Sequence, residues 1–313
     1  MIQAAIDIGT NTMLLLVAEV DPSTHRITRT IDQRIEYPRL GEGVHANRRF
    51  SEAAMNRAFD VFQKYKSICT NHGVEKIFAI ATSASRDSQN AKSFYEKIEK
   101  ELGIHVDIIL GEKEAKFSFL GGMLPGFNAN NTALMDIGGG STEFVTYDPI
   151  KGIPLGQSLD IGCVRATELY LQGDPYTAKS LEELESQLRM MWEKLNPDLQ
   201  TELRKKEWIG IAGTATTMAA IALDLKSFNS EMVDGYRIER CAIADIFESL
   251  AIQSEERRKA NPVIGTGRSD VIVAGAAILL TAMEVFEKEE IIVSSRGLRH
   301  GVLTHPELLT TRE

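Results

Sequence analysis

The sequence predicts an α/β protein built from two related lobes, and three observations support this fold class. Apolar β-rich segments alternate along the chain with segments of helical periodicity. The 313 residues exceed the roughly 150 residues expected for one domain. A short motif around Asp7 returns around Asp136, shifted by 136 − 7 = 129 residues. A turn-rich segment, 125–131, separates the two copies and marks the expected boundary.

The first lobe is expected to span residues 1–125. Apolar β-rich runs predict strands at 3–9 and 12–20, with the small polar turn Gly9-Thr10-Asn11 between them. Ser51 is typical of a helix N-cap, and apolar side chains at helical spacing follow it as far as Gly73, a common stop signal. Further elements expected in this lobe are strands at 28–37, 74–82 and 104–110, and helices at 90–102 and from about 112.

The second lobe is expected to span residues 126–297. It opens with a strand, an aspartate, an apolar residue, a glycine, a small polar turn and a second strand, as the first lobe does. A final helix at 298–313 could pack back on the first lobe. Further elements expected in the second lobe are helices at 164–171, 180–195, 214–224, 238–252 and 268–287, and strands at 208–212 and 291–294.

Composition and charge narrow the class of protein. The formal net charge of −9 argues against a protein that coats nucleic acid, although local basic clusters can still bind a polyanionic substrate. Cys69, Cys163 and Cys241 are widely spaced and form no metal-binding pattern, which favours reduced thiols. The longest uncharged apolar run, 271–283, is shorter than the roughly 18–20 residues of a membrane helix. We therefore expect a cytoplasmic protein with no nucleic-acid or membrane partner.

The two aspartate-containing turns are the strongest indication of chemistry. Backbone N–H groups of a glycine-rich turn form a nest for anions, and the hydroxyls of Thr10, Thr12, Ser141 and Thr142 are additional donors. An aspartate at a strand end can hold a divalent cation against phosphate charge. One such turn alone is more often a plain hairpin. The duplicated pair favours a function.

Other polar residues have competing interpretations. Glu143 follows Ser141 by two residues on the second strand, so it should face the same side as a metal ligand, or else lie in solvent. Glu114 lies near the start of a helix behind a strand, where α/β active sites open, but acidic residues are common there. Arg86 and Arg39 could bind phosphate, yet a lone arginine is more often a surface charge.

The sequence motifs of several other enzyme classes are absent from this chain. The chain contains no P-loop sequence, no H-E-x-x-H and no G-x-S-x-G. The segment 41–46 fits G-x-G-x-x-A but opens no βαβ unit. A P-loop nucleotide enzyme, a zinc protease and an α/β-hydrolase are therefore not supported.

The ordered motifs along the chain resemble the exopolyphosphatase/guanosine pentaphosphate phosphohydrolase (Ppx/GppA) family. The similarity runs nearly end to end. It rests on A-I-D-I-G-T-N-T (5–12), R-L-G-E-G (39–43), A-T-S-A-S-R-D-S-Q-N (81–90), G-E-K-E-A (111–115), D-I-G-G-G-S-T-E (136–143), A-G-T-A-T-T (212–217) and S-x-R-G-L-R-H-G-V-L (294–303). The resemblance implies two RNase-H-like lobes of the actin/hexokinase/Hsp70-like superfamily around a central cleft.

The resemblance also implies roles for individual residues. Glu114 would be the general base for the attacking water. Asp136 and Glu143 would hold Mg²⁺, with help from Asp7, and Arg86 would neutralise phosphate charge. Residues implied to bind the substrate are Thr10, Asn11, Thr12, Arg39, Gly138, Gly139, Gly140, Ser141, Thr142, Gly213 and Thr214.

The implied activity is hydrolysis of the terminal phosphoanhydride of polyphosphate, with pppGpp as the alternative substrate or a second one. A sugar or acetate kinase of the same superfamily and a non-catalytic phosphate or nucleotide sensor are weaker alternatives. Many members of the family look dimeric, so the resemblance allows a homodimer. The chain resembles the short members without helical C-terminal domains, for which weak grip on long polyphosphate is expected. Asp234, where His is frequent, and His300, where Glu is usual, leave local substrate contacts open.

Overall fold

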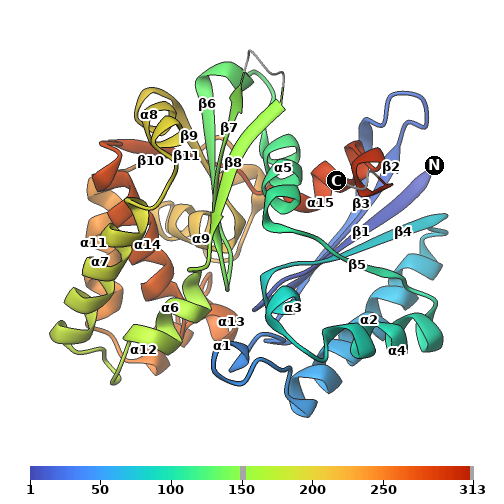
Figure 1. The fold of residues 1–313 in the computed structure, drawn as a ribbon, viewed down its shortest axis with the longest axis horizontal. Helices are drawn as coiled ribbons and strands as arrows, with labels where there is room; N and C mark the ends of the chain where they lie inside the picture. Colours follow the sequence, from blue (N-terminus) through green and yellow to red (C-terminus); the bar gives the residue numbers. More distant parts are fainter. Residues whose placement is uncertain (149–152, 311–313) are drawn as a thin grey trace. The chain divides into compact units, whose positions relative to one another are not determined.

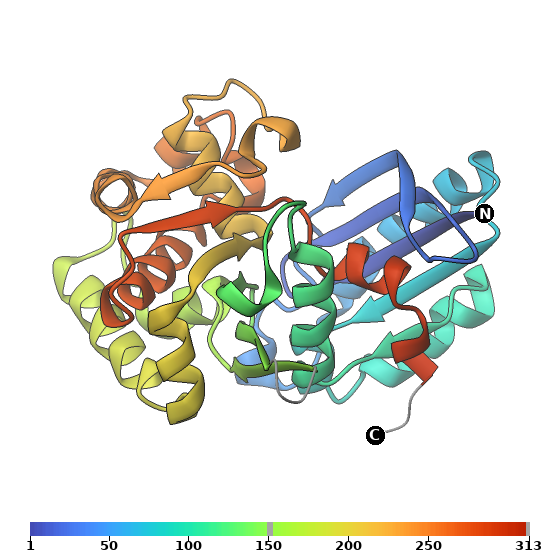
Figure 2. The same ribbon diagram turned by 90° about the horizontal axis from the view of Figure 1, so that it is seen from above.

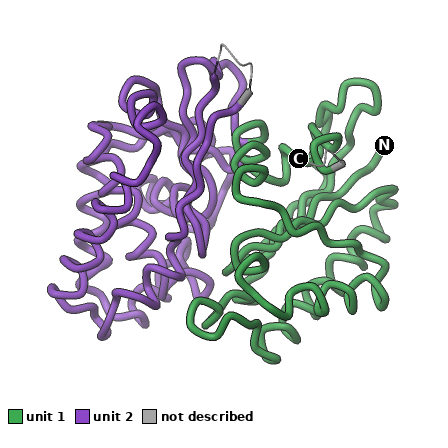
Figure 3. Tube along the Cα trace, viewed as in Figure 1, with its two compact units in different colours: residues 1–121, 297–313 green, residues 122–296 purple. Residues whose placement is uncertain are grey.

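The computed structural model describes residues 1–148 and 153–310. Within these residues the strands form two mixed sheets with helices packed on them, which confirms the predicted α/β class. Contacts divide the chain into unit 1, residues 1–121 with 297–313, and unit 2, residues 122–296 (Figure 3). The lobe boundaries expected from the sequence, after residue 125 and after residue 297, stay a prediction.

The sheet of unit 1 is built around β1, which carries Asp7 near its end. β1 is antiparallel to β2 and parallel to β4, so a meander of three strands continues into a parallel pair. In spatial order the strands are β3 (Ile27–Glu36), β2 (Met13–Val20), β1 (Ile2–Ile8), β4 (Lys76–Ala81) and β5 (Val106–Ile108).

Helices cover both faces of this sheet (Figure 1). Alternate β1 residues Ile6 and Ile8 pack against α2 and α4, whereas Ala5 belongs to the cluster with α5 and α15. The Ser51 side chain accepts a hydrogen bond from the Ala54 amide at 3.2 Å, so the predicted N-cap is confirmed. The helices are α1 (Val44–Asn47), α2 (Glu52–Asn71), α3 (Ser83–Asp87), α4 (Ala91–Leu102), α5 (Gly111–Gly122), α15 (Leu298–Thr304) and α16 (Glu307–Thr310).

The sheet of unit 2 repeats the strand order and the strand directions of unit 1. β6, β7, β9 and β11 take the places of β1, β2, β4 and β5, and β10 is added at the edge. This shared topology confirms the predicted RNase-H-like units. In spatial order the strands are β8 (Ile153–Leu159), β7 (Thr142–Asp148), β6 (Thr132–Ile137), β9 (Glu207–Ile211), β11 (Glu290–Val293) and β10 (Arg237–Glu239).

The core of unit 2 is centred on aromatic residues. Phe144 on β7 makes edge-to-face contacts with Trp192 and Trp208, at centroid distances of 5.5 and 5.6 Å. The helical elements are η1 (Ala129–Asn131), α6 (Cys163–Tyr170), α7 (Ala178–Trp192), α8 (Pro197–Lys205), α9 (Ala212–Ala222), α10 (Ser230–Val233), α11 (Arg240–Ala251), α12 (Glu255–Lys259), α13 (Gly265–Arg268) and α14 (Ile272–Val285). Within residues 1–148 and 153–310, every helix falls short of what a bilayer-spanning segment requires.

Three sequence-based helix predictions were wrong in detail. The expected helix 268–287 is α13 and α14, separated at 269–271, where side chains bind the backbone carbonyls. The expected helix 238–252 begins as strand β10, which pairs with β11. The expected final helix 298–313 is two short helices as far as residue 310, α15 and α16, because the chain breaks at His305-Pro306; its last three residues lie outside the described part of the chain.

Candidate functional site

The two aspartate-containing turns have the same backbone geometry. The Gly9 amide donates to the Thr12 carbonyl at 2.9 Å, and the Gly138 amide donates to the Ser141 carbonyl at 3.0 Å. A Cβ atom on either glycine would lie 3.2 Å from that same carbonyl oxygen. The repeat in the sequence is therefore a repeat in structure, and each turn ends a strand that carries its aspartate.

In unit 1, the segment 39–43 closes onto the first turn. The Arg39 amide donates to the Asn11 carbonyl at 3.1 Å, and the Gly41 amide donates to the Thr10 carbonyl at 2.8 Å. Gly41 is required here because a Cβ atom would lie 2.3 Å from Thr10 Cγ2. Arg39 adopts φ 52°, in the left-handed region that non-glycine residues seldom occupy. The structure thus brings together three residues that the resemblance assigned to substrate binding.

Glu114 and Arg86 form a largely buried ion pair in unit 1. Arg86 Nη1 donates to Glu114 Oε2 at 2.6 Å and to the Ile109 carbonyl at 3.0 Å. The Arg86 side chain is only 19% exposed and that of Glu114 only 11%. Water and salt therefore screen this pair less than they screen an ion pair on the surface. Glu114 lies in the first turn of α5, and its amide donates to the Leu110 carbonyl at 2.9 Å. One carboxylate oxygen of Glu114 is therefore fixed in direction by a cation.

In unit 2, the second turn rests on the start of α6. The amides of Cys163 and Val164 donate to the carbonyls of Gly138 and Gly139, both at 2.9 Å. These bonds engage carbonyl oxygens that would otherwise repel an anion. Thr142 is fully buried, and its hydroxyl donates to the Ile161 carbonyl at 2.6 Å. That hydroxyl therefore helps to hold the turn in place.

Replacing Gly162 by alanine should damage this turn. The new Cβ atom would lie 2.5 Å from the Gly138 carbonyl oxygen and 2.5 Å from the Gly139 carbonyl carbon, and both are backbone atoms. Overpacking of this kind typically costs about 1–3 kcal/mol, so we expect the free energy of unfolding in urea to fall by that amount. An unchanged unfolding midpoint would show that the turn does not depend on this close approach.

Asp136 and Glu143 form a buried carboxylate pair. They are direct cross-strand partners on β6 and β7, and they are 9% and 1% exposed. Ser158 donates its hydroxyl to Glu143 Oε1 at 2.7 Å, which orients that carboxylate. At the matching place in unit 1, Asp7 lies opposite Leu14. The carboxylate pair therefore belongs to unit 2 alone.

The carboxylate pair suits a hard divalent cation. Mg²⁺ is usually bound through one or two carboxylates and keeps several waters. Asp136 and Glu143 are such a set of two carboxylates, so their chemistry fits a Mg²⁺ ion that keeps most of its waters.

Asp7 has a cationic neighbour within unit 1. Arg299 on α15 is partly buried and donates to the Leu15 carbonyl at 3.0 Å. Burial lowers the pKa of Arg299, and the Asp7 carboxylate opposes this shift. Helices α5 and α15 lie side by side (Figure 2), since a Cβ atom on Gly301 would lie 2.0 Å from the Phe117 carbonyl oxygen. The charge of Asp7 therefore faces an arginine of its own unit.

Sequence analysis missed Arg268. A Cβ atom on Gly213 would lie 1.6 Å from Arg268 Nη1, so the guanidinium covers the glycine at the start of α9. Burial raises the pKa of the Cys163 thiol to about 11, and the charge of Arg268 opposes this shift. Arg268 therefore lies near both Gly213 and Cys163, whose amide holds the second turn. The glycines at 265 and 267, just before Arg268, were the available cue, but Arg268 was interpreted as the first residue of a helix spanning 268–287.

Thr214, which was assigned to the substrate, and Asp234 and His300, which depart from the family pattern, are packed in the fold. Thr214 is 2% exposed and lies against Gly275 on α14, where a Cβ atom would be 2.5 Å from its hydroxyl oxygen. Asp234 accepts a hydrogen bond from the Ser295 amide. His300 is 6% exposed within α15. Asp234 and His300, the two departures from the family pattern, therefore both have defined surroundings within the fold.

The fold and the site define an α/β protein in which each of two duplicated turns follows a strand that carries an aspartate, with the Glu114–Arg86 pair in unit 1 and the Asp136–Glu143 pair in unit 2. The chain belongs to the Ppx/GppA phosphatase family, whose model matches residues 16–309. Members of this family are phosphatases, so the chain is a hydrolase by family.

Individual relatives support this membership. The chain is 32% identical to exopolyphosphatase 2 of Mycobacterium tuberculosis, over 96% of both chains. It is 26% identical to the guanosine-5'-triphosphate,3'-diphosphate pyrophosphatase of Photobacterium profundum, over 96% of this chain but 58% of that protein. The crystal structure of an exopolyphosphatase from Cytophaga hutchinsonii matches with a TM-score of 0.86 and 26% identity, over 100% of this chain and 99% of that one.

Proposed function

We propose that this protein hydrolyses the terminal phosphoanhydride of inorganic polyphosphate and releases orthophosphate. The buried Glu114 carboxylate, held by Arg86 at 2.6 Å, is the observation that carries the proposal. The similarity to an exopolyphosphatase over nearly the full length of both chains supports the choice of substrate.

In this proposal Glu114 orients the attacking water and accepts its proton. A glutamate with a reference pKa of roughly 4.3 is a weak base, so alignment must supply much of its effect. The ion pair with Arg86 fixes the carboxylate direction before substrate arrives. The same Arg86 places a positive charge beside the base, where a phosphate would be attracted.

Each unit has its own groups for the negative charge of phosphate. The backbone amides of its turn would bind phosphate oxygens, and in unit 2 the guanidinium of Arg268 would do so as well. Asp136 and Glu143 would hold Mg²⁺, which neutralises phosphate charge when bound. Phosphoryl transfer needs positioning and charge stabilisation more than covalent chemistry, so no protein nucleophile is required.

Hydrolysis of pppGpp is the second candidate. The relative from Photobacterium profundum is named for this type of reaction, and both substrates present a terminal phosphoanhydride. Identity and coverage are higher for the exopolyphosphatase, which places polyphosphate first. A non-catalytic sensor would need no base, and the buried Glu114–Arg86 pair argues against it.

A direct assay tests the proposal. The purified protein is incubated with Mg²⁺ and either polyphosphate or pppGpp, and orthophosphate release is followed over time. We expect release from polyphosphate at a higher kcat/KM than from pppGpp. A reversed order would assign the protein to pppGpp, and no release from either would favour the sensor.

A further inference from the structure

A buried arginine lies outside the residues assigned to the reaction. Arg258 on α12 is 1% exposed. Its Nε donates to the Ser269 carbonyl at 2.7 Å, and its Nη1 donates to the carbonyls of Leu250 and Gln253. The nearest acid that pairs with it, Asp174, is 3.7 Å away and half-exposed. Arg258 is therefore a buried cation that is satisfied mainly by backbone oxygens.

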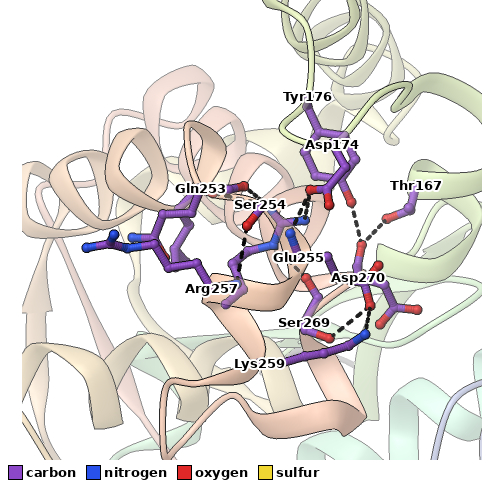
Figure 4. Close-up of polar contacts among 12 residues, drawn as sticks. Thr167, Asp174, Tyr176, Gln253, Ser254, Glu255, Arg257, Lys259, Ser269 and Asp270 are labelled. Carbon is purple, nitrogen blue, oxygen red and sulfur yellow. Dashed lines mark hydrogen bonds and ion pairs between the residues drawn. The ribbon is translucent and has the colours of Figure 1, made fainter.

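Tyr176 completes this arrangement. The guanidinium carbon of Arg258 lies 4.8 Å from the centroid of the Tyr176 ring. The Tyr176 hydroxyl donates to the Asp270 carbonyl at 2.8 Å, and the Thr167 hydroxyl lies 3.5 Å from the same oxygen (Figure 4). Side chains from three separate segments thus bind two consecutive carbonyls.

The bound carbonyls follow Arg268 directly. Ser269 is fully buried, and its hydroxyl lies 3.4 Å from Glu255 Oε1, which also pairs with Lys259 (Figure 4). The Val271 amide donates to the Arg268 carbonyl at 3.0 Å. Every backbone carbonyl from 268 to 270 therefore has a donor, and the chain breaks between α13 and α14 at this place.

We propose that Arg258 and Tyr176 are positioning residues for Arg268. They fix the backbone of 268–270 so that the Arg268 guanidinium stays over Gly213. That Arg268 receives a substrate phosphate there rests on the function proposed above. A fully buried arginine whose ion pair is long and half-exposed on the acid side is costly to desolvate and is weak support for stability. The contacts of Arg258 instead fix the backbone geometry next to Arg268.

The mildest test removes only one hydrogen bond. In Tyr176→Phe the ring over Arg258 remains and the bond to the Asp270 carbonyl is lost. We expect KM for tripolyphosphate to rise about threefold to tenfold while kcat changes less than about twofold. Amide hydrogen exchange in 265–271 should become faster. Arg258→Met should do the same more strongly, and Arg258→Lys should restore part of the loss.

Matched variants separate positioning from general damage. Arg257→Met removes the neighbouring exposed charge and should leave KM and exchange unchanged. Gly213→Ala places a Cβ atom where the Arg268 guanidinium lies, so it should raise KM without slowing folding. In an Arg268→Met background, Tyr176→Phe should have no further effect on KM, because coupled residues are not additive.

The outcomes are distinguishable from failure of the proposed function. If the wild-type protein hydrolyses neither polyphosphate nor pppGpp, that function fails. Calorimetric affinity for tripolyphosphate then replaces KM, and the same threefold to tenfold weakening is expected (about 0.7–1.4 kcal/mol). Faster exchange in 265–271 together with unchanged affinity in Tyr176→Phe would overturn the inference. Unchanged exchange in both Tyr176→Phe and Arg258→Met would overturn it as well.

Discussion

Replacing Glu114 by glutamine is expected to lower kcat for phosphate release by about 10²–10⁴-fold, the usual contribution of general base catalysis. Glutamine has nearly the same shape and still accepts a hydrogen bond from Arg86, but it cannot take a proton from water. Substrate affinity should therefore change far less than kcat. Single-turnover phosphate release measures the chemical step, and calorimetry with tripolyphosphate measures binding.

Two controls accompany this experiment: the free energy of unfolding of Glu114→Gln and the activity of a variant at the neighbouring Glu112. Glu114→Gln leaves the largely buried Arg86 without its opposite charge, so the free energy of unfolding should fall by about 1–3 kcal/mol. Glu112→Gln removes an exposed carboxylate from the same helical turn and should preserve both kcat and stability. If Glu114→Gln retains wild-type kcat, another group activates the water. If it binds tripolyphosphate normally and the wild type shows no turnover, the sensor is favoured.

Patterns that repeat over many residues were predictable from the sequence. The alternation of apolar segments, the shift of 129 residues between Asp7 and Asp136, and the turn glycines gave two units of one topology. The N-cap at Ser51 was also predictable, because one side chain and its local backbone determine it. Each of these features is visible as a local pattern or as a repeat of such a pattern in the sequence.

Features that depend on contacts between distant segments were not predictable. The break at 269–271 arises because Arg258 and Tyr176 bind carbonyls inside what looks like one apolar helix. Arg268 was missed for the same reason, since its neighbour Gly213 is 55 residues earlier, 268 − 213 = 55. The strand β10 was interpreted as helix because its short sequence is explained only by pairing with β11.

The positions of the acidic residues were predictable from the sequence, but the differences between them were not. The sequence placed Asp7, Asp136 and Glu143 at strand ends and grouped all three as metal ligands. The strand register distinguishes them, because Glu143 lies opposite Asp136 whereas Leu14 lies opposite Asp7. The partly buried Arg299 near Asp7 adds a second difference. This contrast leads to a prediction about the metal.

Glu143→Gln is expected to remove the response of the protein to Mg²⁺. Two buried carboxylates at cross-strand positions repel each other unless a cation lies between them or one is neutral. In the absence of a divalent cation, the Tm of Glu143→Gln should therefore be equal to or higher than the Tm of the wild type. Mg²⁺ at roughly 100 times its Kd should stabilise the wild type by about 2.7 kcal/mol and the variant by little.

Asp7→Asn is the matched variant at the equivalent place in unit 1. Its carboxylate lies near Arg299 and opposite Leu14, so its loss should lower the Tm while the Mg²⁺-induced rise in Tm persists. If Asp7 is a metal ligand, that rise disappears in Asp7→Asn as it does in Glu143→Gln. Thermal unfolding of the three proteins with EDTA and with Mg²⁺ distinguishes these outcomes. Equal Mg²⁺ responses in the wild type and in Glu143→Gln would exclude the carboxylate pair as the metal site, because an ion held by Asp136 and Glu143 cannot be indifferent to the loss of one charge.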